Sequence, residues 1–198
     1  MLTALTPPGT AAQGRRVWLV SVTAYTVSGL AASVAVGAVL ALIGRLSSAS
    51  LSSSAGLAIA GALAGLAAAR ELSGGRLPLL QPRRMSSRAW ARLGQPRAAI
   101  LWGLDIGSFF TTRLTFAGAW WLAGVAVLSA DIGLAASLFG AYWLGRAAPV
   151  WLGPWLVTSA TLTPRLAIAW SGLEPRFRFV NAGAALGGTA ALLIVFSG

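Results

Sequence analysis

Long apolar stretches alternate with short polar ones along the whole chain. A helix that crosses the roughly 30 Å hydrocarbon core of a bilayer needs about 20 predominantly apolar residues. Five stretches meet or approach that length, namely residues 17–43, 55–70, 98–128, 132–148 and 178–196. This pattern predicts an all-α integral membrane protein in which about five transmembrane helices pack as a bundle.

Two of these regions do not fit a simple span. Residues 150–177 mix tryptophans with prolines and arginines, which is typical of an interfacial segment or of a partial span, so six spans is the alternative count. The candidate at 98–128 is longer than a bilayer requires and contains Asp105 and Arg113. We expect that helix to be bent or broken.

Composition supports a membrane location. The 198 residues are 57% hydrophobic with a mean hydropathy of +0.76, and only 10% are charged. Soluble domains carry about 25% charged residues, because water must be met by a polar surface. We expect a cytoplasmic tail at 1–16 and a single transmembrane domain at 17–198, with an Arg-rich cytoplasmic loop at 70–97.

The positive charge predicts the orientation. All fifteen basic residues are arginine, and the net charge is +11. With the N-terminus in the cytoplasm, every arginine outside the spans except Arg45 lies on the cytoplasmic side, as the positive-inside rule requires. Five spans then place the C-terminus outside a bacterial plasma membrane. Because the arginines follow this topology, we expect no nucleic-acid partner.

The absence of certain residue types excludes much chemistry. The chain contains no Cys and no His, so it forms no disulfide, no thiol redox centre and no His or Cys metal site. No paired carboxylates and no catalytic triad are apparent. The sequence therefore predicts a protein that holds no cofactor or metal and is not an enzyme. A membrane enzyme is the remaining alternative, and its catalysis would have to use Asp, Glu, Ser, Thr, Tyr or Arg.

Small residues recur at four-residue intervals within the apolar stretches. This spacing places them on one helix face, where two backbones can approach closely in lipid. We expect them to pack helices together, with a hinge role as the alternative. The positions are Gly29, Ser33, Gly37, Gly61, Gly65, Gly103, Gly107, Gly183 and Gly187.

Charged residues within spans are candidates for function, because they are costly in lipid. Asp105 and Arg113 are eight residues apart, about 80° around an ideal helix, with Thr111 and Thr112 between them. They predict either a polar site that binds an anion or relays a proton, or a structural ion pair. Arg146 either marks the end of its span or belongs to the same ion or substrate path.

The order of features resembles the CcdA/DsbD-type transmembrane electron-transfer family. The stretches 28–46, 56–84, 103–118 and 133–149 resemble its second to fifth helices in their Gly, Pro and Arg spacing. That family carries thiols on its first and fourth helices. Here the fourth-helix position reads Phe110-Thr111-Thr112-Arg113, and the first helix is missing. The resemblance implies a non-redox scaffold with inverted three-helix repeats and a site at the bilayer midplane.

Two functions follow as expectations. The first is a small transporter or a component of a membrane complex on this scaffold. The second is an accessory subunit that docks a partner through its small-residue helix faces. The expected partners are the lipid bilayer and either another membrane protein or a second copy of the chain.

Overall fold

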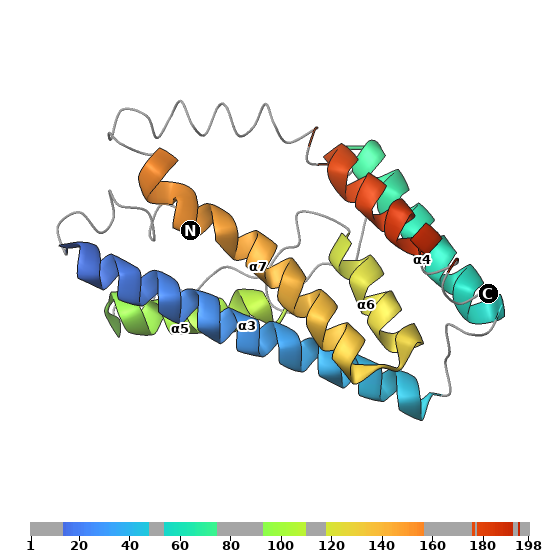
Figure 1. Ribbon diagram of the computed structural model, residues 1–198, viewed down its shortest axis with the longest axis horizontal. Coiled ribbons are helices and arrows are strands. Elements are labelled where there is room, and N and C mark those ends of the chain that lie inside the picture. The colour runs from blue at the N-terminus through green and yellow to red at the C-terminus, as the bar shows by residue number, and fades with distance from the viewer. Residues whose placement is uncertain are drawn as a thin grey trace. The chain divides into compact units, whose positions relative to one another are not determined.

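The computed structural model describes residues 14–47, 54–74, 93–109, 118–156, 176, 178–191 and 194. All regular structure within these residues is helical, with no strand (Figure 1). The helices are α3 (Gly14–Leu46), α4 (Ser54–Leu72), α5 (Gln95–Gly107), α6 (Gly118–Ser129) and α7 (Ile132–Leu156), and residues 178–191 form a further helical segment. The prediction of an all-helical chain is confirmed for this part of the sequence.

Among the described helices, α3 and α4 are long and apolar enough to cross a membrane. Helix α7 has 25 residues, about 37 Å in length, but Arg146 and Pro149 interrupt its apolar sequence. Helices α5 and α6 are shorter, with 13 and 12 residues. Core helices of soluble proteins also pass a test of length and composition, so the burial pattern is needed to separate the two cases.

The chain divides into two compact units, each made of separated segments. Unit 1 comprises residues 1–34, 82–112 and 140–171, and unit 2 comprises residues 35–81, 113–139 and 172–198. Each unit takes one part of α3 and one part of α7. The prediction of a single transmembrane domain is not tested by this division.

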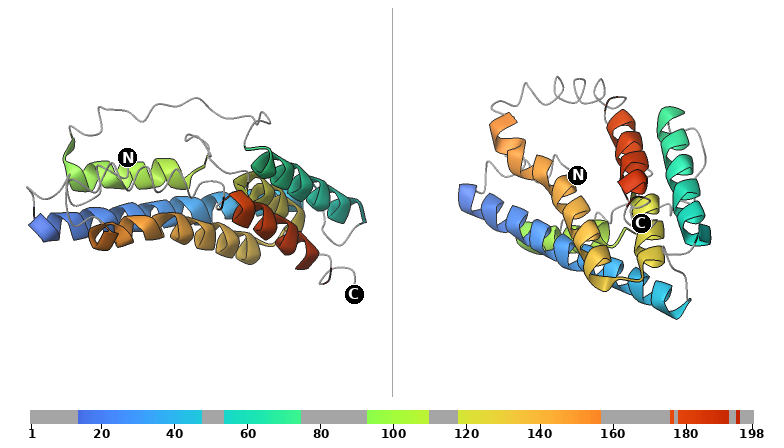
Figure 2. Two further views of the ribbon diagram at one scale, coloured as in Figure 1. Left: turned by 90° about the horizontal axis from the view of Figure 1, so that it is seen from above. Right: turned by 45° about the vertical axis from the view of Figure 1, so that its right-hand side comes forward.

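In unit 1, the first half of α3 packs between α5 and the second half of α7 (Figure 2). Helix α5 runs parallel to α3, since Gly103 lies against Tyr25 and Gly107 lies against Gly29. Helix α7 runs antiparallel to α3. The core that the three helices share consists of Val22, Tyr25, Ala99, Ile106, Trp143, Ala147 and Val150.

Two indole groups attach α7 to the carbonyl and hydroxyl oxygens of one residue on α3. Trp143 Nε1 donates to the Thr26 carbonyl at 2.8 Å, and Trp151 Nε1 donates to Thr26 Oγ1 at 2.9 Å. Trp143 also covers Gly29, where the Cβ of an alanine would overlap the indole ring. The lack of a side chain at Gly29 therefore allows α5 and α7 to approach the same turn of α3.

In unit 2, α4 lies antiparallel to α6. Leu63 contacts Gly124, and Ala60 packs with Leu128 one turn further along. The segment 178–191 lies beside α4 in both views, also antiparallel (Figures 1 and 2). Ala67 packs against Ala185 at this contact.

The segment 178–191 runs parallel to α6. Trp121 Nε1 donates a hydrogen bond to Thr189 Oγ1 at 2.9 Å, and the Trp121 ring covers Gly188. At the start of both elements, an alanine Cβ at Gly118 would lie 3.5 Å from Oδ1 of Asn181. These contacts bring α4, α6 and the C-terminal segment together in unit 2, each against the other two.

The turn between α6 and α7 is held against the end of α3 within unit 2. Arg45 Nε donates to the Ala130 carbonyl at 2.6 Å, and Gly44 lies against the Val127 carbonyl. Asp131 caps α7, because its Oδ1 accepts the backbone N–H of Leu134 at 2.9 Å. Asp131 is exposed, as its position in a turn predicts.

Two predicted spans differ from the helices observed. The candidate at 98–128 is not one continuous helix, since α5 ends at Gly107 with Ser108 as its C-cap, and α6 begins at Gly118. The candidate at 132–148 continues past Pro149 to Leu156. Pro149 does not end the helix because Val150 and Trp151, which follow it, pack against α3. Residues 157–175, most of the ambiguous segment, lie outside the described part.

Candidate functional site

Asp105 lies in the last turn of α5 and is buried, with 8% of its surface exposed. Helix α5 ends at Gly107 against Gly29, which is close to the midpoint of the 33-residue helix α3. Residues 103 and 107 are each about 160–200° from residue 105 around the helix. Asp105 is therefore on the side of α5 that faces away from α3.

The end of α5 has a defined geometry. The backbone N–H of Ser108 donates to the Leu104 carbonyl at 3.0 Å, and Ser108 Oγ donates to the Asp105 carbonyl at 2.8 Å. Phe109 follows with φ of 61°, a left-handed conformation that is unusual for a bulky residue. Its ring packs on Tyr142 of α7 at 5.5 Å between centroids, which holds the chain in this turn.

The other predicted members of the Asp105 site, Thr111, Thr112 and Arg113, lie outside the described residues. An Asp105–Arg113 pair stays a prediction. Asp105 makes further interactions with its surroundings, so it is not an isolated residue. Within the described residues, no group of three His, Cys, Asp or Glu side chains is placed to hold a metal ion.

Arg146 lies in the interior of α7 and not at its end. The helix continues for ten residues beyond it, to Leu156. The guanidinium carbon of Arg146 is 5.9 Å from the centroid of the Tyr142 ring, a cation–π contact.

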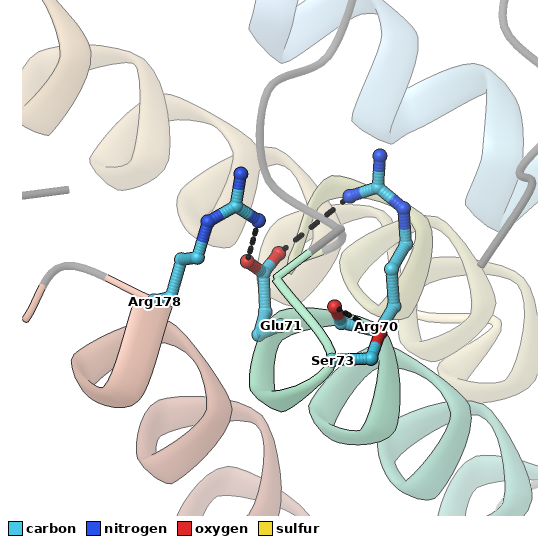
Figure 3. Close-up of polar contacts among 4 residues, drawn as sticks. All are labelled: Arg70, Glu71, Ser73 and Arg178. Carbon is cyan, nitrogen blue, oxygen red and sulfur yellow. Dashed lines mark hydrogen bonds and ion pairs between the residues drawn. The ribbon is translucent and has the colours of Figure 1, made fainter. Parts of the chain in front are cut away.

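A second charged cluster lies in unit 2 at the end of α4 (Figure 3). Glu71 Oε2 accepts a hydrogen bond from Arg178 Nη1 at 3.1 Å, and Glu71 Oε1 lies 3.9 Å from Arg70 Nη1. The Glu71 side chain is only 1% exposed. Ser73 Oγ donates to the Arg70 carbonyl at 2.9 Å, which completes the helix end.

Sequence reasoning missed this cluster because it placed Glu71 in a solvated loop at 70–97. In the structure, both Arg70 and Glu71 belong to the last turn of α4. The available signal was that Glu71 directly follows the apolar stretch without a break. Its pairing with a residue 107 positions away has no counterpart in the local sequence.

The small residues named from their spacing fall into two groups. The first group lies at close contacts. In unit 1 it includes Gly29, Gly103 and Gly107, and Ser33 is fully buried. In unit 2, a Cβ added at Gly37 would lie 2.6 Å from the Ala135 carbonyl oxygen. In contrast, an added Cβ would meet nothing within 4 Å in the described chain at Gly61, Gly65, Gly183 and Gly187. Close contacts that spacing did not single out occur at Gly44, Gly124 and Gly188.

Comparison of the chain with protein-family models, with curated proteins and with solved structures gave no match.

Proposed function

We propose that the chain is a five-pass membrane protein that acts as a transporter, with the end of α5 as part of its transport path. The burial pattern supports the membrane location. More than half of the buried apolar residues are alanine, while large apolar side chains such as Val20, Val27 and Leu66 are exposed. Small residues between helices and large ones outside are typical of helices packed in lipid. In water, so much exposed apolar surface would favour aggregation.

The directions of the helices support five passes. In unit 1, α5 runs parallel to α3, and α7 runs antiparallel to α3. In unit 2, α6 runs parallel to residues 178–191, and α4 runs antiparallel to both. Within each unit, neighbouring helices therefore run in the two opposite senses that alternating passes require. A six-pass chain would reverse the last segment, which would then oppose α6.

This alternation agrees with the distribution of charge. A five-pass topology with a cytoplasmic N-terminus would put the start of α3, the end of α4, the start of α5 and residue 178 on one side of the bilayer. That side carries Arg15, Arg16, Arg70, Arg97, Arg176 and Arg178. The other side carries Arg45 and Asp131. The positive-inside rule then places the N-terminus in the cytoplasm and the C-terminus outside.

The end of α5 near the midpoint of α3 is the observation that carries the transport proposal. A helix of 13 residues is about 20 Å long and reaches only part of the way through a bilayer. Transporters place their sites at such interrupted helices, where backbone groups and buried charges are available at the midplane. Asp105 supplies the buried carboxylate. The same arrangement fits a non-redox scaffold related to the CcdA/DsbD type.

The topology is tested by single-cysteine accessibility, for which a chain without cysteine needs no prior substitution. Ser73→Cys at the end of α4 is expected to react with a membrane-impermeant maleimide only after the membrane is opened. Ser47→Cys at the end of α3 is expected to react in intact cells. Equal labelling of both variants in intact cells would refute the alternating topology.

The role of Asp105 is tested by ion flux in proteoliposomes that contain the purified chain. Asp105→Asn is nearly isosteric, and we expect it to abolish flux while membrane insertion is retained. Asp131→Asn is the matched control, because Asp131 is exposed at a helix N-terminus and an asparagine retains the cap. Full flux in the Asp105→Asn protein would exclude this carboxylate from the path.

A specific observation also favours the second function, an accessory subunit. A Cβ added at four glycines would meet no described atom within 4 Å, at Gly61 and Gly65 of α4 and at Gly183 and Gly187 of the segment 178–191. Such positions are suited to close approach of another helix. Gentle purification from the native membrane distinguishes the two functions. A stoichiometric membrane partner together with an inactive isolated chain would support the accessory subunit over the transporter.

A further inference from the structure

Three arginines of unit 1 are exposed at the starts of two helices. Arg15 and Arg16 lie in the first turn of α3, and Arg97 lies in the first turn of α5. No hydrogen bond or ion pair engages these three side chains within the described residues. The charged cluster of unit 2 differs, since its two arginines flank a carboxylate. The guanidinium groups of the three unit 1 arginines are therefore open to a partner outside the chain.

The packing of α5 on α3 brings these arginines to the same end of unit 1. The two helices run parallel and are in contact at Gly103 and Tyr25. Arg97 lies six residues, about 9 Å, before this contact, and Arg16 lies nine residues, about 14 Å, before it. The starts of both helices lie on the same side in both views (Figures 1 and 2). We call this region the basic end of unit 1, defined by Arg15, Arg16 and Arg97.

No acid of unit 1 lies near enough to balance this charge. Unit 1 contains nine of the fifteen arginines and a single acid, Asp105. Asp105 lies in the last turn of α5, eight residues and about 12 Å along the axis from Arg97. The other end of α3 differs, since Arg45 donates to the Ala130 carbonyl and the next residue is the exposed Asp131. The basic end of unit 1 therefore favours a negatively charged partner.

Exposed apolar side chains continue along the same helix faces as two of these arginines. On α3, Val20 and Val27 are exposed and lie within about 40° of Arg16 around the helix. On α5, Leu104 is exposed and lies about 20° from Arg97. A charge at the end of an exposed apolar face matches the shape of a phospholipid, whose phosphate lies above its acyl chains.

A pair of tryptophans occurs at the same end of the unit. Trp18 is two residues beyond Arg16, and its ring packs edge to face against Trp151 of α7, with 6.2 Å between centroids. Neither ring is buried. Indole rings favour the interface between headgroups and acyl chains. This observation is independent of the charges, and it supports the same position for this end of unit 1.

From these observations we propose that the basic end of unit 1 binds the headgroups of anionic phospholipids. The proposal rests on the membrane location in the proposed function and adds a lipid partner to it. A guanidinium donates two parallel hydrogen bonds to a phosphate, and its charge attracts a headgroup with net negative charge more than a zwitterionic one. The acyl chains lie along the exposed apolar faces of α3 and α5.

The test is native mass spectrometry of the purified full-length chain in detergent, titrated with phosphatidylglycerol or with phosphatidylcholine of the same acyl chains. We expect the wild-type chain to bind phosphatidylglycerol about fivefold more tightly, the contribution of one arginine near an anionic surface. The double variant Arg16→Gln/Arg97→Gln is expected to lose most of this preference. The double variant Arg16→Lys/Arg97→Lys should retain it, because both charges remain.

Arg45→Gln is the matched control for the single variants Arg16→Gln and Arg97→Gln. It removes one arginine from the other end of α3, where Asp131 already supplies a negative charge. Arg45→Gln is expected to keep the preference of the wild-type chain, whereas each of the other two single variants should lower it.

A free phosphate offers the same oxygens as a headgroup but has no acyl chains. Inorganic phosphate, added in excess to the wild-type chain, is therefore expected to leave phosphatidylglycerol bound. Displacement of the lipid by phosphate would identify a site for free anions and overturn the lipid proposal.

A measurement on the unaltered chain covers the case in which the variants fail to fold. Phenylglyoxal modifies accessible arginines, and mass spectrometry locates the adducts. Phosphatidylglycerol is expected to protect Arg16 and Arg97 more than phosphatidylcholine does, with Arg45 modified equally in both lipids. Equal affinity of the wild-type chain for the two lipids, an unchanged preference in the double glutamine variant, or equal protection by the two lipids would overturn the proposal.

The lipid titration and the flux assay separate this proposal from the proposed function. A lipid preference that depends on Arg16 and Arg97, in a chain that carries no flux, would retain the lipid surface and refute transport. Flux that depends on Asp105, in a chain without lipid preference, would retain transport and refute the lipid surface. A chain that stays soluble and monodisperse without detergent would refute the membrane location and both proposals with it.

Discussion

Glu71 and Arg178, 107 positions apart in the chain, form a buried hydrogen-bonded ion pair with 3.1 Å between Oε2 and Nη1. The pair joins the end of α4 to the start of the C-terminal helical segment. Arg70 lies at 3.9 Å from the other carboxylate oxygen, so one acid is flanked by two arginines. Removal of the acid would leave two positive charges close together in a poorly hydrated place.

Glu71→Ala is therefore expected to destabilise the folded chain by about 3–5 kcal/mol, the usual effect of breaking a buried pair. Thermal unfolding in detergent, followed by circular dichroism, measures the change. Arg176→Ala is the control, since Arg176 is exposed and lies two positions before Arg178. Equal melting temperatures for Glu71→Ala and the wild-type chain would show that the pair contributes nothing.

Gly29→Ala is expected to destabilise unit 1 by about 1–3 kcal/mol, the range for overpacking a well-packed contact. The added methyl group would overlap the Trp143 indole, which is hydrogen-bonded to α3 and has little freedom to move. Gly61→Ala, where an added Cβ meets open space in the described chain, should be neutral or slightly stabilising. Unfolding curves of the two variants in the same detergent make the comparison, and a larger loss for Gly61→Ala would contradict it.

Asp131→Ala removes the N-cap of α7, because the Leu134 N–H loses its acceptor. We expect a loss of about 1 kcal/mol, typical for a cap. Asp131→Ser should recover most of that loss, since a hydroxyl oxygen accepts the same hydrogen bond. Amide hydrogen exchange in the first turn of α7 reports the effect locally, and unchanged exchange in Asp131→Ala would contradict it.

Thr189→Val leaves the Trp121 indole N–H without its acceptor in unit 2. The expected loss is about 1–3 kcal/mol, the penalty for a buried donor left unpaired. Thr189→Ser keeps the hydroxyl and is expected to be nearly neutral. The emission maximum of tryptophan fluorescence and the melting temperature are measured together, and identical values for Val and Ser at this position would argue against the hydrogen bond.

The spacing of small residues shows how far the sequence goes. Four-residue intervals place Gly103 with Gly107, and Gly61 with Gly65, on common faces, and both deductions need only helical periodicity. The structure brings α3 against the first pair, whereas a Cβ added to either glycine of the second pair would meet no described atom within 4 Å. Periodicity says which residues share a face, whereas a contact depends on which other helix covers it.

The charged residues give the same lesson. Asp105 and Arg146 are conspicuous in the sequence because they interrupt apolar stretches, and both lie within helices in the structure. From the sequence, Pro149 predicts that the helix ends soon after Arg146. In the structure, contacts of Val150 and Trp151 with α3 accompany a helix that continues beyond the proline. The local sequence predicts a loop at Glu71, because the partner that stabilises this carboxylate in the helix, Arg178, is 107 positions away.

By itself, the sequence determined that the chain is helical, where most helices begin, and which residue types are absent. These properties are local, because an α-helix satisfies its backbone hydrogen bonds within its own segment. Only the tertiary structure decided that α5 ends against the middle of α3, that Glu71 pairs with Arg178, and that Trp143 donates to the Thr26 carbonyl. Those relationships join residues far apart in the chain, and they depend on how apolar faces pack against one another.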